Sequence, residues 1–195
     1  EVVRRNLSHL EEGDDYWIFQ RITRGQNVVG GELWQSSGPT VIVECTPLPI
    51  KTRAKVFHEG IDMHVPSIRR IPPECLSPSV KSHNYLNLVL ADLEVRHKGP
   101  NAWAILLDTR GFLCEGIGCN LFLVRNGCLL TPRSQYVLAG VSRQTVIELA
   151  EKLGIPVIED DLLPYDALNA DEAFITSTSF CICPARSFNG KVIGD

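Results

Sequence analysis

Apolar and polar positions along the chain predict a mixed set of strands and helices. Runs of β-favouring apolar residues that stop at Gly, Pro or paired turn residues predict strands. These runs lie at residues 17–23, 40–45, 102–107, 121–124, 128–130, 156–159 and 172–176, with further short strands expected within 55–71. Asn126-Gly127, between two of the runs, predicts a tight hairpin turn.

Apolar residues spaced three and four apart predict the helices. A long helix is expected over about residues 80–98, ended by Gly99-Pro100, and a second over about 142–153. Their apolar stripes are Leu86, Val89, Leu90 and Leu93, and Val146, Leu149, Ala150 and Leu153. A short helix is expected near 165–169, and Glu1–Asn6 is interpreted as the end of a helix. Strands and helices mix without strict alternation, which favours an α+β fold, or α/β with mixed sheets.

Proline placement predicts a boundary between two domains. Pro72, Pro73 and Pro78 make a stiff, non-helical connector just before the long helix. We therefore expect the chain to divide at residues 72–78.

Composition narrows the class of protein. The 195 residues carry a net charge of −4, so no basic excess points to nucleic acid or an anionic membrane. No apolar run approaches the roughly 18 residues of a membrane helix. The seven cysteines form an odd set and lie mostly in apolar runs, which favours reduced core residues in a cytoplasmic protein.

The sequence lacks most familiar catalytic and ligand-binding motifs, but a few of its residues could take part in catalysis or binding. Lys81 follows the proline connector at the expected start of the long helix, with Tyr85 four residues later on the same helix face. It could be a solvated lysine or an amine that forms a Schiff base. Cys181-x-Cys183 could bind a metal, but alternation along a strand explains it better.

Further candidates are a carboxylate and two anion-binding features. Glu115 stands between apolar runs and before Gly116-Ile117-Gly118, so it is either at an exposed turn or buried with a partner. Ser142 is a good N-cap for the second helix, whose first N–H groups would suit a phosphate. Thr176-Ser177-Thr178-Ser179 is either another phosphate contact or a polar turn.

These features together resemble a known family. A Schiff-base lysine, a carboxylate, a helix-terminus anion site and a hydroxyl turn are what pyridoxal phosphate requires. Their order resembles the class IV (fold type IV) aminotransferases, the group of branched-chain and D-amino-acid aminotransferases. The matching stretches are residues 81–86, 115–122, 131–132, 138–143, 170–174, 176–178 and Pro184.

The resemblance implies a role for each matched residue. Lys81 would carry the internal aldimine with pyridoxal 5'-phosphate and shuttle a proton between Cα and C4′, so we expect burial to lower its pKa. Glu115 would keep the pyridine nitrogen protonated. The other implied contacts are Tyr85 to the phenolic oxygen, Leu138 to the ring, Val141, Ser142 and Thr178 to the phosphate, and Asn120 in support of the glutamate loop.

The resemblance also implies a two-domain α+β fold like that of D-amino-acid aminotransferase. Residues 1–71 would be the remainder of a small N-terminal α/β domain, 72–78 the connector, and 79–195 the large cofactor domain. Family members are longer, so the sequence is expected to lack an N-terminal part, with a phosphate-binding arginine, and a short C-terminal segment. The implied partners are an amino donor, a 2-oxo acid acceptor and a second copy of the chain in a homodimer.

The reaction subtype stays open at the level of sequence. Tyr16-Trp17-Ile18-Phe19 lacks the arginine that branched-chain enzymes carry there, and residues 26–31 lack the arginine and histidine of D-amino-acid enzymes. A branched-chain, D-amino-acid or (R)-amine transaminase, an aminodeoxychorismate-lyase-like enzyme, and a non-catalytic descendant acting as a binding module are the alternatives. Retention of Lys81, Tyr85 and Glu115 favours an enzyme.

Overall fold

The computed structural model describes residues 1–9 and 11–194, which divide into two compact units, Glu1–Ala54 and Lys55–Asp195. This division falls before the proline connector at 72–78. Strand β3 (Ile61–His64) pairs in parallel with β4 (Ala102–Leu107) and β10 (Cys181–Phe188). These backbone bonds place residues 55–71 in the larger unit, and not in the unit formed by the N-terminal residues.

The smaller unit is built around a long antiparallel ribbon. After α1 (Val2–Asn6) and the 3-10 helix η1 (Leu7–His9), β1 (Asp15–Thr23) pairs with β2 (Thr40–Leu48) along its whole length. Side chains alternate between the two faces, so the Trp17 and Phe19 rings lie together with centroids 4.5 Å apart. Both predicted strands are confirmed, and the second continues to Leu48.

The residues after the ribbon are helical, which corrects the prediction of strands from residue 55 onwards. Helix α2 spans Ile50–Glu59 and follows Pro49, whose carbonyl accepts hydrogen bonds from the Thr52 hydroxyl and the Arg53 N–H. Gly60, with φ +75°, ends it in the left-handed conformation that favours glycine. Only β3 remains of the strands expected within 55–71.

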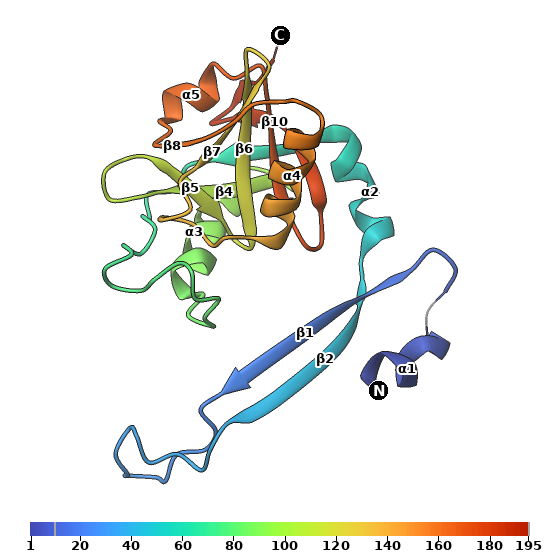
Figure 1. Cartoon of the computed structure of the whole chain (residues 1–195), viewed down its shortest axis with the longest axis vertical. Coiled ribbons are helices and arrows are strands. Elements are labelled where there is room, and N and C mark those ends of the chain that lie inside the picture. Colours follow the sequence, from blue (N-terminus) through green and yellow to red (C-terminus); the bar gives the residue numbers. More distant parts are fainter. Residues whose placement is uncertain (10, 195) are drawn as a thin grey trace. The chain divides into compact units, whose positions relative to one another are not determined.

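Six strands of the larger unit close into a barrel (Figure 1). The ring runs β10, β3, β4, β5, β6 and β9, and β9 returns to pair with β10. The strands not yet given bounds are β5 (Leu113–Gly116), β6 (Cys119–Arg125), β9 (Glu172–Ser177), and the additional β7 (Cys128–Pro132), β8 (Val157–Asp160) and β11 (Lys191–Val192). The predicted turn at Asn126-Gly127 joins β6 to β7, and both residues have positive φ.

Alternation along the strands divides the core into an inner and an outer part. Ile105, Leu121 and Ile175 are fully buried in one cluster. Their neighbours face outward, where Leu106 packs under α3 (Leu86–Arg96) and Phe122 packs under α4 (Val141–Lys152). The short α5 (Pro164–Leu168) adds its residues to the inner cluster. The expected α+β fold is confirmed.

The buried faces of the two long helices differ from the faces that their apolar stripes predicted. In α3 the buried residues are Leu88, Ala91, Asp92 and Val95, whereas Leu86, Val89, Leu90 and Leu93 are exposed. In α4, Val146 and Ala150 of the predicted stripe are buried, and Leu149 and Leu153 are exposed. A stripe identifies an apolar face, but the strand beneath the helix decides which face is covered.

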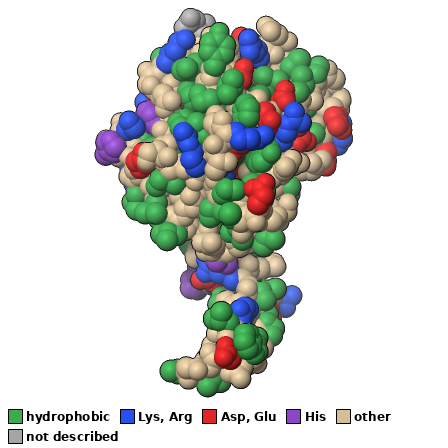
Figure 2. All heavy atoms as spheres, turned by 90° about the vertical axis from the view of Figure 1, so that its left-hand side faces the viewer, with side chains coloured by type: hydrophobic (Ala, Val, Ile, Leu, Met, Phe, Trp, Pro, Cys, Tyr) green, Lys and Arg blue, Asp and Glu red, His purple; other side chains and the backbone are tan. Residues whose placement is uncertain are grey.

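Surface charge in the larger unit is mixed in sign. On the face shown in Figure 2, basic and acidic side chains are interspersed over this unit. One pair links two barrel strands, because Arg186 on β10 donates to Asp62 on β3 at 2.8 and 2.7 Å. Within the described residues, no helix is long and apolar enough to cross a membrane.

Candidate active site

A cavity of about 340 Å³ lies in the larger unit. Its floor comes from β5, β6 and β9, and its walls come from residues 76–82, the start of α3 and the segment leading into α4. The structure brings all eight residues predicted from the sequence to this one cavity. They are Lys81, Tyr85, Glu115, Asn120, Leu138, Val141, Ser142 and Thr178.

Glu115 reaches the cavity because the strand pairing slips by one residue. Leu107 pairs with Leu113, but Ile105 pairs with Gly116, so β5 holds one residue more than β4 between these pairs. Simple alternation would put Glu115 on the same face as the core residue Leu113. The slip turns Glu115 to the outer face, where it pairs with Asn120.

Glu115 is buried and held by two donors. Arg70 Nε donates to its Oε1 at 2.9 Å, and the Leu138 N–H donates to its Oε2 at 3.0 Å. Burial raises the pKa of Glu115, while the Arg70 guanidinium opposes that rise. The sequence left an exposed turn and a buried pair equally open, and the structure shows the buried pair.

Arg70 is the site residue that sequence reasoning missed. Its own N–H bonds to the Leu107 carbonyl, which fixes it beside the end of β4. Arg69-Arg70 stands 45 residues before Glu115 in no recognisable motif. The pairing of β4 with β3 on one side and β5 on the other brings these two segments together, so local sequence gave no signal.

Asn120 fixes the segment that leads into α4. Its Nδ2 donates to the Leu138 carbonyl at 2.8 Å, so the Leu138 residue is held by Asn120 on one side and Glu115 on the other. Gly140 must pass close to this amide, because a Cβ there would lie 2.2 Å from Asn120 Oδ1. The glycine is therefore required by a close approach and not by its φ of −67°.

The start of α4 faces the cavity, but Ser142 does not cap it. Gly140 is the N-cap, and Val141 and Ser142 are the first two helical residues. The first N–H groups of a helix have no partner within the helix and carry a partial positive charge. Val141 and Ser142 thus present N–H groups suited to an anion, as expected, although the predicted N-cap role of Ser142 is wrong.

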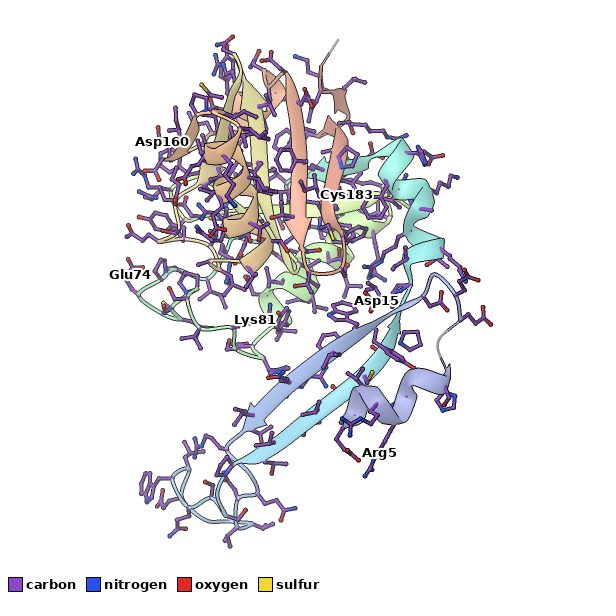
Figure 3. All side chains as sticks on the ribbon, turned by 45° about the vertical axis from the view of Figure 1, so that its right-hand side comes forward. Arg5, Asp15, Glu74, Lys81, Asp160 and Cys183 are labelled. Atoms are coloured by element: carbon purple, nitrogen blue, oxygen red, sulfur yellow. The ribbon has the colours of Figure 1, made fainter. Side chains whose placement is uncertain are left out.

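Lys81 and Tyr85 do not share a helix face, which corrects the sequence prediction. Helix α3 begins at Leu86, Tyr85 is its N-cap residue, and residues 81–84 lie outside the helix. A lysine inside the first helical turn would oppose the helix dipole, which agrees with the later start. Lys81 lies on the segment that leads into α3, and it is exposed and not buried as we expected (Figure 3).

The hydroxyl residues at the end of β9 have different surroundings. Thr176 and Thr178 line the cavity, with Thr176 buried and Thr178 exposed. Ser177 also borders it, but its hydroxyl accepts a bond from the Phe180 N–H at 3.1 Å and so closes a turn. Thr176 Oγ1 is buried and has no hydrogen-bond partner among residues 1–9 and 11–194.

Known proteins match almost the whole chain. The sequence model of the family described as amino-transferase class IV matches residues 5–188. The chain belongs to the class IV aminotransferase family. Lys81, Glu115 and residues 138–143 lie within the matched range.

Several relatives of this class IV chain are similar along most of it. A Methanocaldococcus jannaschii protein, provisionally named a branched-chain-amino-acid aminotransferase, is 40% identical over 93% of this chain and 62% of its own length. The branched-chain-amino-acid aminotransferase of Escherichia coli K12 is 36% identical over 80% of this chain and 50% of its own. The chain thus spans about half to three fifths of these relatives.

Solved structures agree with the sequence comparison. The crystal structure of the Escherichia coli branched-chain amino acid aminotransferase superimposes with a TM-score of 0.88 and 33% identity, covering 100% of this chain and 62% of that one. The enzyme of the same name from Thermoproteus uzoniensis, solved with norvaline, gives a TM-score of 0.72 at 35% identity, covering 80% and 52%. Class IV structures therefore share the fold of this chain.

The cavity fits pyridoxal 5'-phosphate by its donors and acceptors. It offers an amine, a buried carboxylate, the N–H groups of a helix start and the unpartnered Thr176 hydroxyl. Among residues 1–9 and 11–194, no group of three or more potential metal ligands gathers. Cys181 and Cys183 lie on strand β10, as expected, but only Cys183 is buried, although alternation would put both on one face.

Proposed function

We propose that this protein is a pyridoxal-phosphate-dependent aminotransferase that moves an amino group between an amino acid or amine and a 2-oxo acid. One observation carries the proposal: Lys81, Glu115 and the first turn of α4 border one cavity. A reactive amine, a carboxylate and an anion site around one cavity are what a pyridine aldehyde phosphate needs.

The buried pair of Glu115 and Arg70 would set the protonation state of the cofactor's pyridine ring. When bound, pyridoxal phosphate supplies an electron sink for the carbanion formed at the substrate Cα. Glu115 would hold a proton at the pyridine nitrogen, which makes that sink effective. Arg70 and the Leu138 N–H favour the ionised carboxylate against the effect of burial and fix its orientation, because each bonds one of its oxygens.

The remaining residues would bind the cofactor and move the proton. Lys81 would hold it covalently through its amine and later carry a proton between the substrate Cα and C4′. Val141 and Ser142 would bind the phosphate through their N–H groups, with the Ser142 and Thr178 hydroxyls assisting. Tyr85 would donate to the phenolic oxygen, Leu138 would pack on the ring, and Asn120 would hold the Leu138 segment in place.

We further propose branched-chain amino acids as the donors, since the relatives named above carry that activity in their names. A 2-oxo acid would be the acceptor. The protein would act in the cytoplasm, as the cysteines indicated, and as a homodimer, as the sequence resemblance implied.

A spectroscopic experiment tests the cofactor and its lysine. Purified protein is titrated with pyridoxal phosphate, reduced with borohydride and digested for mass spectrometry. We expect a visible absorption band that reduction removes, and a mass increase fixed on the peptide holding Lys81. Lys81→Ala should abolish both, whereas Lys98→Ala, a change in an exposed lysine outside the cavity, should not.

A donor screen then separates the possible reactions. L-leucine, D-alanine and (R)-1-phenylethylamine are offered with 2-oxoglutarate, and aminodeoxychorismate is offered alone. Glutamate formed with L-leucine would support the branched-chain assignment, and pyruvate released from aminodeoxychorismate would replace it with a lyase. Binding of the cofactor without turnover of any substrate would favour a non-catalytic relative.

A further inference from the structure

Three strands of the barrel present one row of polar residues to the cavity. Glu115 on β5 pairs with Asn120 on β6, and Asn120 pairs with Thr176 on β9. Neighbouring strands lie about 4.8 Å apart, so Thr176 stands roughly 10 Å across the sheet from Glu115. All three are at most 5% exposed and all line the cavity.

Thr176 differs from the rest of the row in its hydrogen bonding. Glu115 accepts two hydrogen bonds and Asn120 donates one, but Thr176 Oγ1 has no partner in the part of the chain that the structure describes, although the residue is only 1% exposed. Leaving a buried hydroxyl unpaired is unfavourable, so such a group in a binding cavity indicates a ligand.

The position of Thr176 shows which part of a ligand it would meet. Phe174, two residues earlier on the same face of β9, packs against the cluster that includes the α4 residues Val146 and Ala150. Thr176 therefore lies one step further along β9, and it shares the cavity with Val141 and Ser142 at the first turn of α4. That turn is the anion-binding end of the helix.

We propose that Thr176 is a further cofactor-positioning residue, whose hydroxyl donates a hydrogen bond to the phosphate group bound at the start of α4. This rests on the proposed function, because it takes the ligand to be a phosphorylated pyridine. The Ser177 hydroxyl is already used by the turn to Phe180, so Thr176 and Thr178 are the cavity-lining hydroxyls of this segment that remain for the phosphate.

The test compares ligands with and without the phosphate. Pyridoxine 5′-phosphate and pyridoxine lack the aldehyde, so their affinities measured by equilibrium dialysis exclude covalent attachment to Lys81. Thr176→Val replaces the hydroxyl with a methyl group of similar size, and Thr176→Ser restores the hydroxyl. We expect Thr176→Val to weaken pyridoxine 5′-phosphate about tenfold and pyridoxine less than about twofold, with Thr176→Ser within about twofold of the wild type.

A second measurement separates ligand binding from a structural role. Without ligand, Thr176→Val should keep or raise the melting temperature, since it removes an unpaired buried hydroxyl. Its stabilisation by pyridoxine 5′-phosphate should nevertheless be smaller than that of the wild type.

The outcomes are distinct. Equal affinity of wild type and Thr176→Val for pyridoxine 5′-phosphate overturns the assignment of Thr176 alone. An equal loss for both ligands shows that the hydroxyl acts on something other than the phosphate, and also overturns it. No binding of pyridoxine 5′-phosphate or pyridoxal phosphate by the wild type overturns this inference together with the proposed function.

Discussion

Replacing Arg70 by methionine would test the electrostatic core of the site. The Arg70 and Glu115 side chains are 12% and 7% exposed, and their contact is 2.9 Å. Methionine keeps most of the apolar stem but removes the charge. Glu115 would then retain only the Leu138 N–H as a donor in a buried position.

The expected loss follows from the cost of a buried, unpaired carboxylate. Removing one partner of such a pair destabilises a protein by about 3–5 kcal/mol. Protonation could relieve the cost, but at pH 8 it takes about 5 kcal/mol for a carboxyl of ordinary pKa, and at pH 5 about 1 kcal/mol. We therefore expect Arg70→Met to lose about 3–5 kcal/mol at pH 8 and about 1–2 kcal/mol at pH 5.

The direction with pH follows from the pKa of Glu115, which burial raises further once Arg70 is gone. A folded state that binds the proton more tightly than the unfolded state gains stability as pH falls. The variant should therefore approach the wild type towards pH 5. The double variant Arg70→Met/Glu115→Gln should recover more than half of the loss at pH 8, because no buried charge remains.

Urea unfolding followed by Trp103 fluorescence measures these values within the larger unit. Trp17 and Trp34 are replaced by phenylalanine in all variants, so that Trp103 alone reports. A loss below about 1 kcal/mol that is equal at both pH values would refute the account of the pair. So would a double variant no more stable than Arg70→Met.

Three further predictions concern other parts of the structure. Gly140→Ala should break the Asn120 hydrogen bond to the Leu138 segment, which would lower the free energy of unfolding in urea by about 1–2 kcal/mol and the affinity for pyridoxine 5′-phosphate in dialysis several-fold. Unchanged values would contradict the close approach of Gly140 to Asn120. Asp62→Asn should cost about 1 kcal/mol at pH 7, because its arginine partner lowers the pKa of Asp62. This cost should begin to fall near pH 4, where the unfolded carboxyl takes up a proton, and disappear below the lowered pKa of the folded one; a cost that stays constant from pH 7 to about pH 2 would argue against the ion pair. Burial raises the pKa of the Cys119 thiol to about 12, so iodoacetamide at pH 8 should label it about a hundredfold more slowly than the exposed Cys181. Similar labelling rates, measured by mass spectrometry, would contradict the burial of Cys119.

Local signals in the sequence located most elements of the fold. The Asn126-Gly127 turn, the strand at 102–107 and the helix before Gly154 depend on neighbouring residues, and the structure contains all three. Helix α2 was missed although Ile50, Ala54 and Phe57 recur at helical spacing, because strands were expected from residue 55 onwards, over its second half. The long helix was extended too far because apolar spacing does not exclude the non-helical conformation of residues 81–84.

The candidate site was predicted by family resemblance and not by local patterns. Glu115 alone was ambiguous, because one slipped pair in β5 decides whether it faces the core or the cavity. Arg70 had no motif, since its link to Glu115 spans 45 residues and depends on the pairing of β3, β4 and β5. Contacts of this kind depend on how distant strands pair, and periodicity within one segment does not predict that pairing.

The register of β9 shows how closely the fold and the proposed chemistry are linked. Ile175 is fully buried in the inner cluster and Thr176 faces the cavity, so a slip of one residue against β6 would exchange them. The exchange would bury a hydroxyl in the apolar core and expose an isoleucine to the anion site, and both changes are unfavourable. Packing in the barrel therefore selects the same register that puts Glu115, Asn120 and Thr176 in one row. A substitution that weakens the inner cluster at Ile175 should consequently reduce cofactor affinity without touching the cavity, because it relaxes the constraint that keeps this row aligned.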